Sequence, residues 1–447
     1  MNATIIEFRN PIKPIAQFVR VDHAHRRLGD LYAAGRLPIR RAVFDASRLP
    51  AQKELADSFR HDGIEIVLDT EVAELAAREK IATHVNKAPW ASVADGNVVG
   101  PQFFDGTNPH IDIIGSIARF AVQHDVDTVL APTHFLGDRD FEGWLSIDVR
   151  SCMALRKALD REGGNHIAID YSVIHSHVAL NQTEQRSELI TRISDLPIDN
   201  VWVRASGLGN EPKPQTTRQF LASMYGLHNL GKPIIADYSD GLMAHALLAF
   251  GGVSGVAHGI GERGKFDAGG WHKEPTPRDE SNPFRRATYI PISGLGRAFK
   301  GKEIELLASA KGGRKLVGCQ NECCAHGVQD MKSDPRQHAA NESLAPIRAL
   351  ASVPDFNRED YFLSRPLREA ETLARNLKDL NPSQKDAERL DVNLESLKKR
   401  LGDHHRKIGK LSDTLGLLHD ERGAGAPRAP VAMTRGGEQS SKERKKP

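Results

Sequence analysis

Seven short apolar runs rich in Val and Ile recur between residues 40 and 260, and stretches of helical periodicity follow them. Runs of four to six such residues are typical of parallel strands buried on both faces. The pattern therefore predicts the α/β class and a TIM-type (β/α)8 barrel. The runs lie at 42–45, 64–69, 128–134, 166–170, 201–204, 233–237 and 253–258.

The eighth strand is the least defined, and we expect it at 314–318. Residues 1–38 should form an N-terminal segment with an edge strand at 4–8 and a helix near 22–34. The barrel then spans 39–380, with a Cys/His insertion at 316–340. A helical coiled coil follows at 381–421, and the Gly-, Ala-, Pro- and Ser-rich tail at 422–447 should be disordered.

Nearly every apolar run ends in a residue that can do chemistry. In a barrel the carboxyl ends of the strands meet at one open face, so these side chains should share one pocket. Carboxylates gathered in a closed pocket cannot all stay ionised without cations or hydrogen-bond donors, and such a conflict tunes general acids and nucleophiles. We therefore predict Asp69, Asp170 and Asp237 as catalytic and His134, Arg204 and His258 as substrate-binding; a single strand-end Asp can instead be a helix N-cap. The strand-end residues are Asp45, Asp69, His134, Asp170, Arg204, Asp237 and His258.

Three of the four cysteines cluster at Cys319, Cys323 and Cys324. Three thiolates and one imidazole are a common set of ligands for structural zinc. His338 is the better fourth ligand, because His326 lies too close to Cys324 to bind the same ion without strain. We predict a structural Zn²⁺ site on these four residues; a vicinal redox pair and inert buried thiols are the alternatives.

Between Leu390 and Leu418 the apolar positions are spaced alternately by four and three residues, with His404 as an interruption. This repeat favours a two-stranded coiled coil. We therefore expect a homo-oligomer that forms through residues 385–420. The alternative is an amphipathic helix that folds back onto the barrel.

Charge separates the tail from the rest of this 447-residue chain. Residues 422–447 hold seven basic and two acidic residues, a net +5, so the overall +3 leaves about −2 for the remainder. Grooves for nucleic acid normally need clustered Lys and Arg, and residues 285–315 are the best local candidate. No run of 18 apolar residues and no signal-peptide pattern is present, so we expect a cytoplasmic protein without a membrane segment.

The loop Ser206-Gly207-Leu208-Gly209-Asn210-Glu211 resembles the Gly-Gly-Leu-x-x-Gly-Glu base-binding loop of tRNA-guanine transglycosylases. In that family a Cys-rich zinc site also follows the last strands, and its histidine opens a C-terminal helix, as His338 would here. The resemblance implies a barrel enzyme that exchanges a nucleobase in tRNA or DNA, with Ser206, Gly207, Leu208 and Gly209 holding the base. Glu262, in the polar stretch after the last apolar run, joins the substrate-binding candidates.

This chain departs from the family at two places. The family's zinc pattern is C-x-C-x-x-C, and its nucleophilic Asp follows Gly-Val, where Gly252-Val253 is followed by Ser254. The nucleophile or general base would then be Asp237 or Asp69. Two other functions stay open: a lyase or hydrolase for a small metabolite that uses Asp170, Asp237 and His258, and a non-catalytic zinc-stapled platform for assembly.

Overall fold

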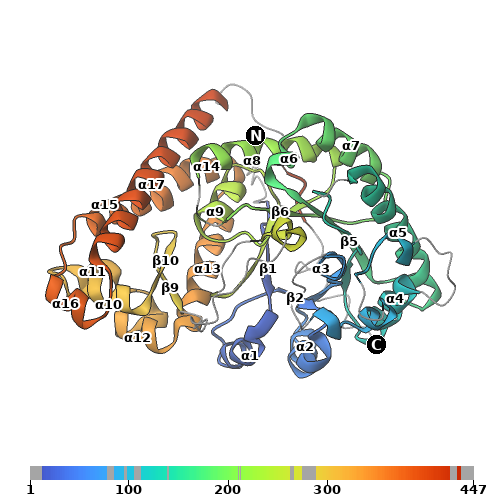
Figure 1. Cartoon of the computed structure of the whole chain (residues 1–447), viewed down its shortest axis with the longest axis horizontal. Coiled ribbons are helices and arrows are strands. Elements are labelled where there is room, and N and C mark those ends of the chain that lie inside the picture. Colours follow the sequence, from blue (N-terminus) through green and yellow to red (C-terminus); the bar gives the residue numbers. More distant parts are fainter. Residues whose placement is uncertain are drawn as a thin grey trace, which may run out of the picture.

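The structure is a computed structural model, and it describes residues 13–77, 85–94, 98–104, 112–137, 140–209, 211, 213–261, 266–273, 288–422 and 430–433. Eight parallel strands form a closed barrel in chain order, and the last pairs with the first (Figure 1). The predicted (β/α)8 barrel is therefore confirmed. The strands are β1 (Ala16–Arg20), β2 (Arg41–Asp45), β3 (Glu65–Asp69), β4 (Thr128–Leu130), β5 (Ala168–Ser176), β6 (Val201–Ser206), β7 (Ile234–Asp237) and β8 (Gly255–Gly259).

Each of the seven predicted runs overlaps a strand, but the predicted eighth strand is wrong. Residues 314–318 lie largely in the helix α11 (Gly313–Val317). The missing strand is β1, so the barrel begins at Ala16, inside the segment predicted to precede it. β1 was missed because Gln17 and Arg20 interrupt its apolar pattern. The edge strand predicted at 4–8 lies outside the described residues.

Nine α-helices of the described residues accompany the barrel strands. Their buried faces pack on the outward side chains of the strands and form the main core. Alternate strand residues point inward instead, where Phe18 and Trp202 pack at 4.7 Å between ring centroids. The helices are α1 (His25–Ala33), α2 (Lys53–His61), α3 (Val72–Leu75), α4 (Ile113–Gln123), α5 (Phe141–Arg161), α6 (His177–Leu180), α7 (Thr183–Ile193), α8 (Pro214–Leu227) and α9 (Gly241–Ala249).

A second, smaller core lies beside the barrel (Figure 1) and contains Cys319 and Cys324. It is built on the antiparallel pair β9 (Tyr289–Ile292) and β10 (Arg297–Lys300). The helices after the barrel are α10 (Gly301–Ser309), α11, α12 (Val328–Ser333), α13 (Pro335–Ala351), α14 (Arg358–Phe362), α15 (Arg368–Lys378), α16 (Gln384–Arg389) and α17 (Leu394–Arg422). No helix of the described residues is long and apolar enough to cross a membrane.

The predicted coiled coil is wrong, because α17 packs against its own chain, on α15 and α8. Its first half enters the second core and its second half enters the main core. The alternative of a helix folded back on the barrel is what the structure has. The prediction of a homo-oligomer was based on an exposed apolar seam, and this seam is buried within the chain. The buried seam residues are Leu394, Leu397, Leu401, Ile408, Leu411 and Leu415.

Part of the tail predicted to be disordered is docked on the barrel. Residues 430–433 lie at the amino-terminal end of the strands, where the Ser254 hydroxyl donates a 2.6 Å hydrogen bond to the carbonyl of Val431. Met433 is only 3% exposed and packs with the apolar residues of the barrel interior. This segment therefore fills the end of the barrel opposite the predicted pocket. Residues 423–429 and 434–447 lie outside the described residues.

Candidate functional site at the mouth of the barrel

Two arginines and two aspartates form a buried network at the carboxyl ends of β1, β3, β6 and β7. Arg20 donates to both oxygens of Asp237, at 2.8 and 2.5 Å, and to Asp69 at 2.9 Å. Arg204 donates to the same two carboxylates, at 2.8 and 2.6 Å. No side chain of the four is more than 4% exposed. The predicted convergence of Asp69, Arg204 and Asp237 is thus what the structure has.

The network balances two positive charges against two negative ones inside the barrel. Burial alone would raise the pKa of Asp69, but the charges of Arg204 and Arg20 outweigh it and lower the pKa to about 2. Burial likewise opposes the charge of Arg20, yet the carboxylate of Asp237 keeps its pKa above the ordinary value. The Asp69 carboxylate is therefore ionised across the whole physiological range.

Further carboxyl groups surround the network on the side of β2 and β3. Asp45 lies 3.6 Å from Arg20 and 3.4 Å from Arg48, and burial with the nearby charges of Glu71 and Asp69 raises its pKa well above the usual range. Burial also raises the pKa of Glu74 to about 8, with Asp69 adding to the effect. Ionised and neutral carboxyl groups thus stand side by side, as general acid–base chemistry requires.

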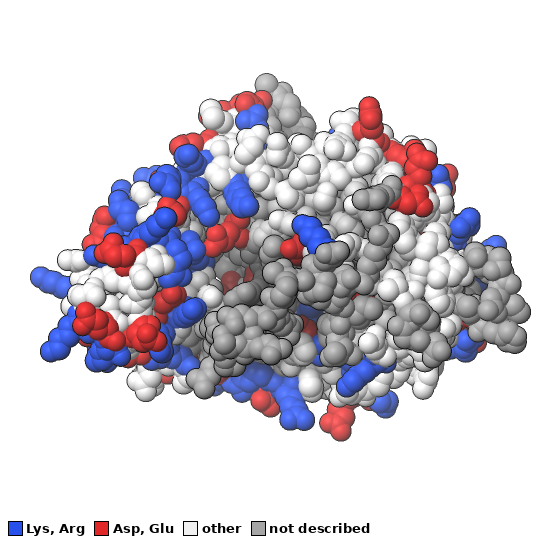
Figure 2. Space-filling model, viewed as in Figure 1, with Lys and Arg blue, Asp and Glu red and all other residues white. Residues whose placement is uncertain are grey.

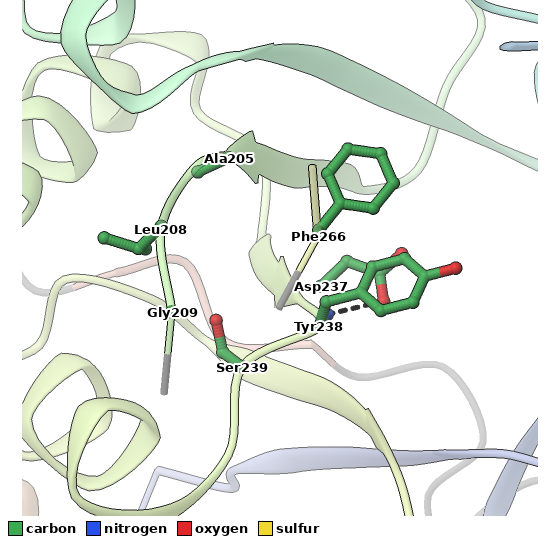
Figure 3. Close-up of a pocket in the computed structure, with 7 residues that line it drawn as sticks. All are labelled: Ala205, Leu208, Gly209, Asp237, Tyr238, Ser239 and Phe266. Atoms are coloured by element: carbon green, nitrogen blue, oxygen red, sulfur yellow. Dashed lines mark hydrogen bonds between the residues drawn. The ribbon is translucent and has the colours of Figure 1, made fainter. Parts of the chain in front are cut away.

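A small pocket opens above Asp237 (Figure 3). The Tyr238 ring stacks on Phe266, with 4.9 Å between the centroids, and the Arg20 guanidinium lies 4.3 Å from the centre of the same tyrosine ring. The pocket therefore combines an aromatic wall with a carboxylate floor. Its lining is Ala205, Leu208, Gly209, Asp237, Tyr238, Ser239 and Phe266.

Strained backbone accompanies this pocket. Asp22, Glu71 and Tyr238 have φ angles of 38°, 54° and 56°, in the region that side chains with a Cβ seldom adopt. Each follows the carboxyl end of a strand, β1, β3 or β7, by one or two residues. Such strain costs on the order of 1–3 kcal/mol per residue and concentrates at binding and catalytic sites. Three of the five positive-φ residues other than glycine in the described part of the chain thus lie at this end of the barrel.

The loop Ser206–Gly209 borders the pocket. Two of its residues hold the loop in place by hydrogen bonds, and the other two line the pocket. The Ser206 hydroxyl accepts a 2.9 Å bond from Gly269, and Gly207 donates through its backbone to Phe266 at 2.9 Å. These two residues thus tie the loop to residues 266–273. Gly207 has a φ of 81°, which explains the glycine. Leu208 and Gly209 line the pocket and are the members placed to touch a ligand.

Asp170 does not join the pocket, which corrects its prediction as a catalytic residue. β5 continues to Ser176, so Asp170 lies near the beginning of the strand rather than at its end. It accepts hydrogen bonds from Asn200 at 2.9 Å and from the Trp202 indole at 2.8 Å. Asp170 therefore accepts hydrogen bonds inside the barrel near the amino-terminal ends of the strands, away from the pocket.

The two predicted substrate-binding histidines also lie apart from the pocket. His134 lies against α5, where its backbone and ring donate to Asp148 at 3.0 and 2.6 Å. His258 follows the inward-facing Ala257, so it points outward and its ring accepts from Gln17 at 3.0 Å. Glu262 lies outside the described residues.

Sequence reasoning missed Arg20, Tyr238 and Glu74. A signal for Arg20 did exist: several strand-end carboxylates in one closed pocket need cations, and Arg20 ends a short stretch with an inward-facing Phe18. Tyr238 follows a predicted strand-end Asp directly. Nothing in the pattern marks Glu74, because its helix α3 has only four residues.

The cluster of Cys319, Cys323, Cys324 and His338 is assembled as predicted. The sulfur of Cys323 lies 3.7 Å from that of Cys319 and 3.6 Å from that of Cys324, and Nδ1 of His338 lies 3.5 Å from the sulfur of Cys324. A tetrahedral ion with bonds of about 2.3 Å to sulfur and about 2.05 Å to nitrogen places its ligands about 3.8 and 3.5 Å apart. The four side chains can therefore hold a metal ion, whereas His326 is exposed and outside the cluster.

The surroundings of the cluster favour metal binding. Burial would raise the pKa of Cys319, but hydrogen bonds, led by one from His338, lower it to about 7. A thiol must lose its proton to bind a metal. The other ring nitrogen of His338 donates to the carbonyl of Pro291 at 2.8 Å, which fixes the ring as the outer partner of a metal-bound histidine does.

No protein-family model matches the chain, and no curated protein matches it. Among solved structures, the chain is similar to the crystal structure of KGPDC from Streptococcus mutans, with 14% sequence identity and a TM-score of 0.33. The match covers 55% of this chain and 88% of that one.

Proposed function

We propose that the mouth of the barrel binds a flat nucleobase and exchanges it at a sugar carbon, as the resemblance to tRNA-guanine transglycosylases implies. The observation that carries the proposal is the pocket itself, in which the aromatic wall of Tyr238 and Phe266 stands over the carboxylate of Asp237, and Arg20 connects that carboxylate to Asp69. Aromatic faces stack well on any base, and carboxylates serve cleavage of the bond between sugar and base.

The two fixed aspartates have different roles in this proposal. A carboxylate can accept about four hydrogen bonds. Asp237 already accepts four, three from the arginines and one from the backbone of Tyr238. Asp69 accepts three, from Arg20, Arg204 and the backbone of Glu71, so one lone pair is left. Asp69 is accordingly the nucleophile, and Asp237 positions the arginines that hold it.

A basic surface beside the mouth supports a nucleic-acid substrate. Figure 2 shows Lys and Arg side chains gathered over α15 and α17, with acidic side chains among them. Arg297 and Lys407 lie 3.3 and 3.4 Å from Glu211, which is two residues beyond Gly209 of the pocket. Phosphates that follow this surface would bring a base to the pocket. The basic residues of α17 include Lys398, Lys399, Arg400, Arg406, Lys407 and Lys410.

The test combines binding with base exchange. Purified protein is mixed with tRNA or duplex DNA and radiolabelled guanine, and label in the polymer is counted. Binding of the polymer is measured at about 50 and 200 mM salt, the range in which phosphate binding changes affinity most visibly. We expect labelled polymer and salt-sensitive binding. Lys407→Gln and Lys410→Gln each remove one cation that would pair with a phosphate, so each should lower the salt slope by about 1.

Deletion of residues 422–447 distinguishes the mouth from the basic tail, although it also removes Met433. A second variant therefore keeps 422–433 and neutralises only the later basic residues. Nucleic-acid binding that survives this neutralisation supports the proposal. Binding of a small base without any polymer would favour the small-metabolite lyase or hydrolase, and binding of neither would favour the assembly platform.

A further inference from the structure

Glu74 occupies a position over the mouth of the barrel that the network of arginines and aspartates leaves unexplained. It belongs to α3, which follows β3 directly. Its neighbour Ala73 packs with Phe135, Ile174 and Phe266 in a small cluster over the barrel end. The left-handed backbone of Glu71 turns the chain into this helix. The left-handed Glu71 thus leads into a short helix whose Glu74 carboxyl group lies near the charges of Asp69 and Arg204.

The Glu74 carboxyl group is placed to hold a proton. Its Oε2 atom is buried and has no hydrogen-bond partner among the residues that the structure describes. An ionised carboxylate in such a place would lose its hydration without replacement, whereas the neutral acid tolerates it. The nearby negative charge of Asp69 disfavours ionisation further and, with burial, raises the pKa of Glu74 to about 8. At neutral pH Asp69 is ionised and Glu74 is protonated.

Asp45 is another carboxyl group beside Asp69 whose pKa burial raises, but its oxygens are engaged. One lies 3.6 Å from Arg20 and the other 3.4 Å from Arg48. A proton donor to a ligand needs an oxygen that the protein does not already use. Glu74 is the group with such an oxygen.

We propose that Glu74 is the general acid and base of the exchange at this site, a role that rests on the proposed function. The Asp69 carboxylate forms a bond to the sugar carbon C1′ as the bond from C1′ to the base nitrogen breaks. The electron pair of that bond stays on the base nitrogen, which takes the proton of Glu74. The resulting Glu74 carboxylate then removes the proton from the incoming base, whose nitrogen attacks C1′ and releases Asp69. Each proton and bond is restored at the end of the cycle.

The test uses the full chain with Glu74→Gln, which keeps the size of the side chain and removes its exchangeable acid. The matched control is Glu54→Gln, an exposed glutamate on α2. Thermal unfolding of both variants should stay close to that of the wild type, because Gln replaces a neutral acid at position 74 and an exposed side chain at position 54. We expect Glu74→Gln to slow label incorporation by about 10²- to 10⁴-fold, the usual contribution of a general acid, while Glu54→Gln remains unchanged.

A leaving group that needs no proton separates catalysis from structure. Nucleic acid carrying 7-methylguanine presents a base that is already cationic, so it departs without protonation. Release of 7-methylguanine by Glu74→Gln should reach within about tenfold of the wild-type rate. If the variant is equally slow on both substrates, or fully active on unmodified nucleic acid, Glu74 is not the acid although the exchange stands. If the wild type incorporates no label and releases no base, the proposed function fails, and the role of Glu74 with it.

Discussion

Arg20 and Asp237 show how strongly single residues depend on each other inside this barrel. Arg20 makes two hydrogen bonds to Asp237 and one to Asp69, and all three side chains are almost fully withdrawn from solvent. A buried ion pair adds little net stability over an apolar core, but the loss of one partner leaves an uncompensated charge. The mouth of the barrel therefore tolerates substitution of the network poorly.

Asp237→Asn should destabilise the fold by about 3–5 kcal/mol, because Arg20 and Arg204 would share one buried carboxylate instead of two. Urea unfolding measures the change in free energy. The control is Asp195→Asn, on the exposed surface, which should stay within about 0.5 kcal/mol. An unchanged free energy of unfolding in Asp237→Asn would contradict the dependence of Arg20 and Arg204 on both buried carboxylates.

The residues of the site that could be predicted are those at the ends of the apolar runs. Asp69, Arg204 and Asp237 follow directly from strands of ordinary pattern, so their convergence could be predicted. Asp170 was misplaced because β5 runs on through Ser172, His175 and Ser176, whose polar side chains concealed the true strand end. Burial of polar strand residues depends on distant partners, and a single sequence does not reveal those partners.

At the scale of elements, α17 joins the two cores of the molecule. Leu397 and Leu401 pack in the second core, while Ile408, Leu411 and Leu415 pack in the main core. His404 lies between these groups, where its ring donates a 3.0 Å hydrogen bond to the carbonyl of Leu295. The spacing by four and three residues predicted the buried stripe of this helix. It could not tell a partner helix in another chain from one in the same chain, because both bury the same stripe.

Acid should loosen this junction. Burial lowers the pKa of His404 from its ordinary 6.5 to about 4. As the pH falls, the unfolded chain takes up the proton first, so stability is full above pH 6.5 and is lost between about pH 6.5 and 4. His404→Gln should flatten this dependence by up to about 1.4 kcal/mol per pH unit, measured by urea unfolding at several pH values. The exposed His61→Gln should keep the wild-type slope; an identical slope in His404→Gln would contradict the burial of a neutral ring.

At the scale of the whole molecule, the Cys/His cluster is the place where a metal ion could hold the second core together. Its ligands come from the turn before α12 and from α13, so one ion would clamp these segments under β9. The structure supports a metal ion there, and we propose zinc from the tetrahedral spacing and the thiolate-rich set.

Purified protein should carry about one zinc ion per chain. Cys323→Ser should lower the zinc content and speed hydrogen exchange in β9, β10 and α12, while the barrel strands stay protected, because a structural ion contributes its binding energy to local folding. Cys152→Ala, at the buried thiol of α5 outside the cluster, should keep the metal. Full zinc in Cys323→Ser, or unchanged exchange after treatment with a strong chelator, would contradict the assignment.

Met433 and β1 together determine when this barrel can be completed during synthesis. β1 can pair with β8, and so close the barrel, only after β8 has been synthesised. Arg20 likewise lacks its partner until Asp237, 217 residues later, has been made. Met433 then fills the far end of the interior. At about 5–20 residues per second, a ribosome needs on the order of 20–90 s to produce the chain up to this residue. Until then Phe18, and Trp202 once it has been made, lack their final enclosure, so the nascent chain passes through a long interval in which it can aggregate and in which a chaperone has most to protect.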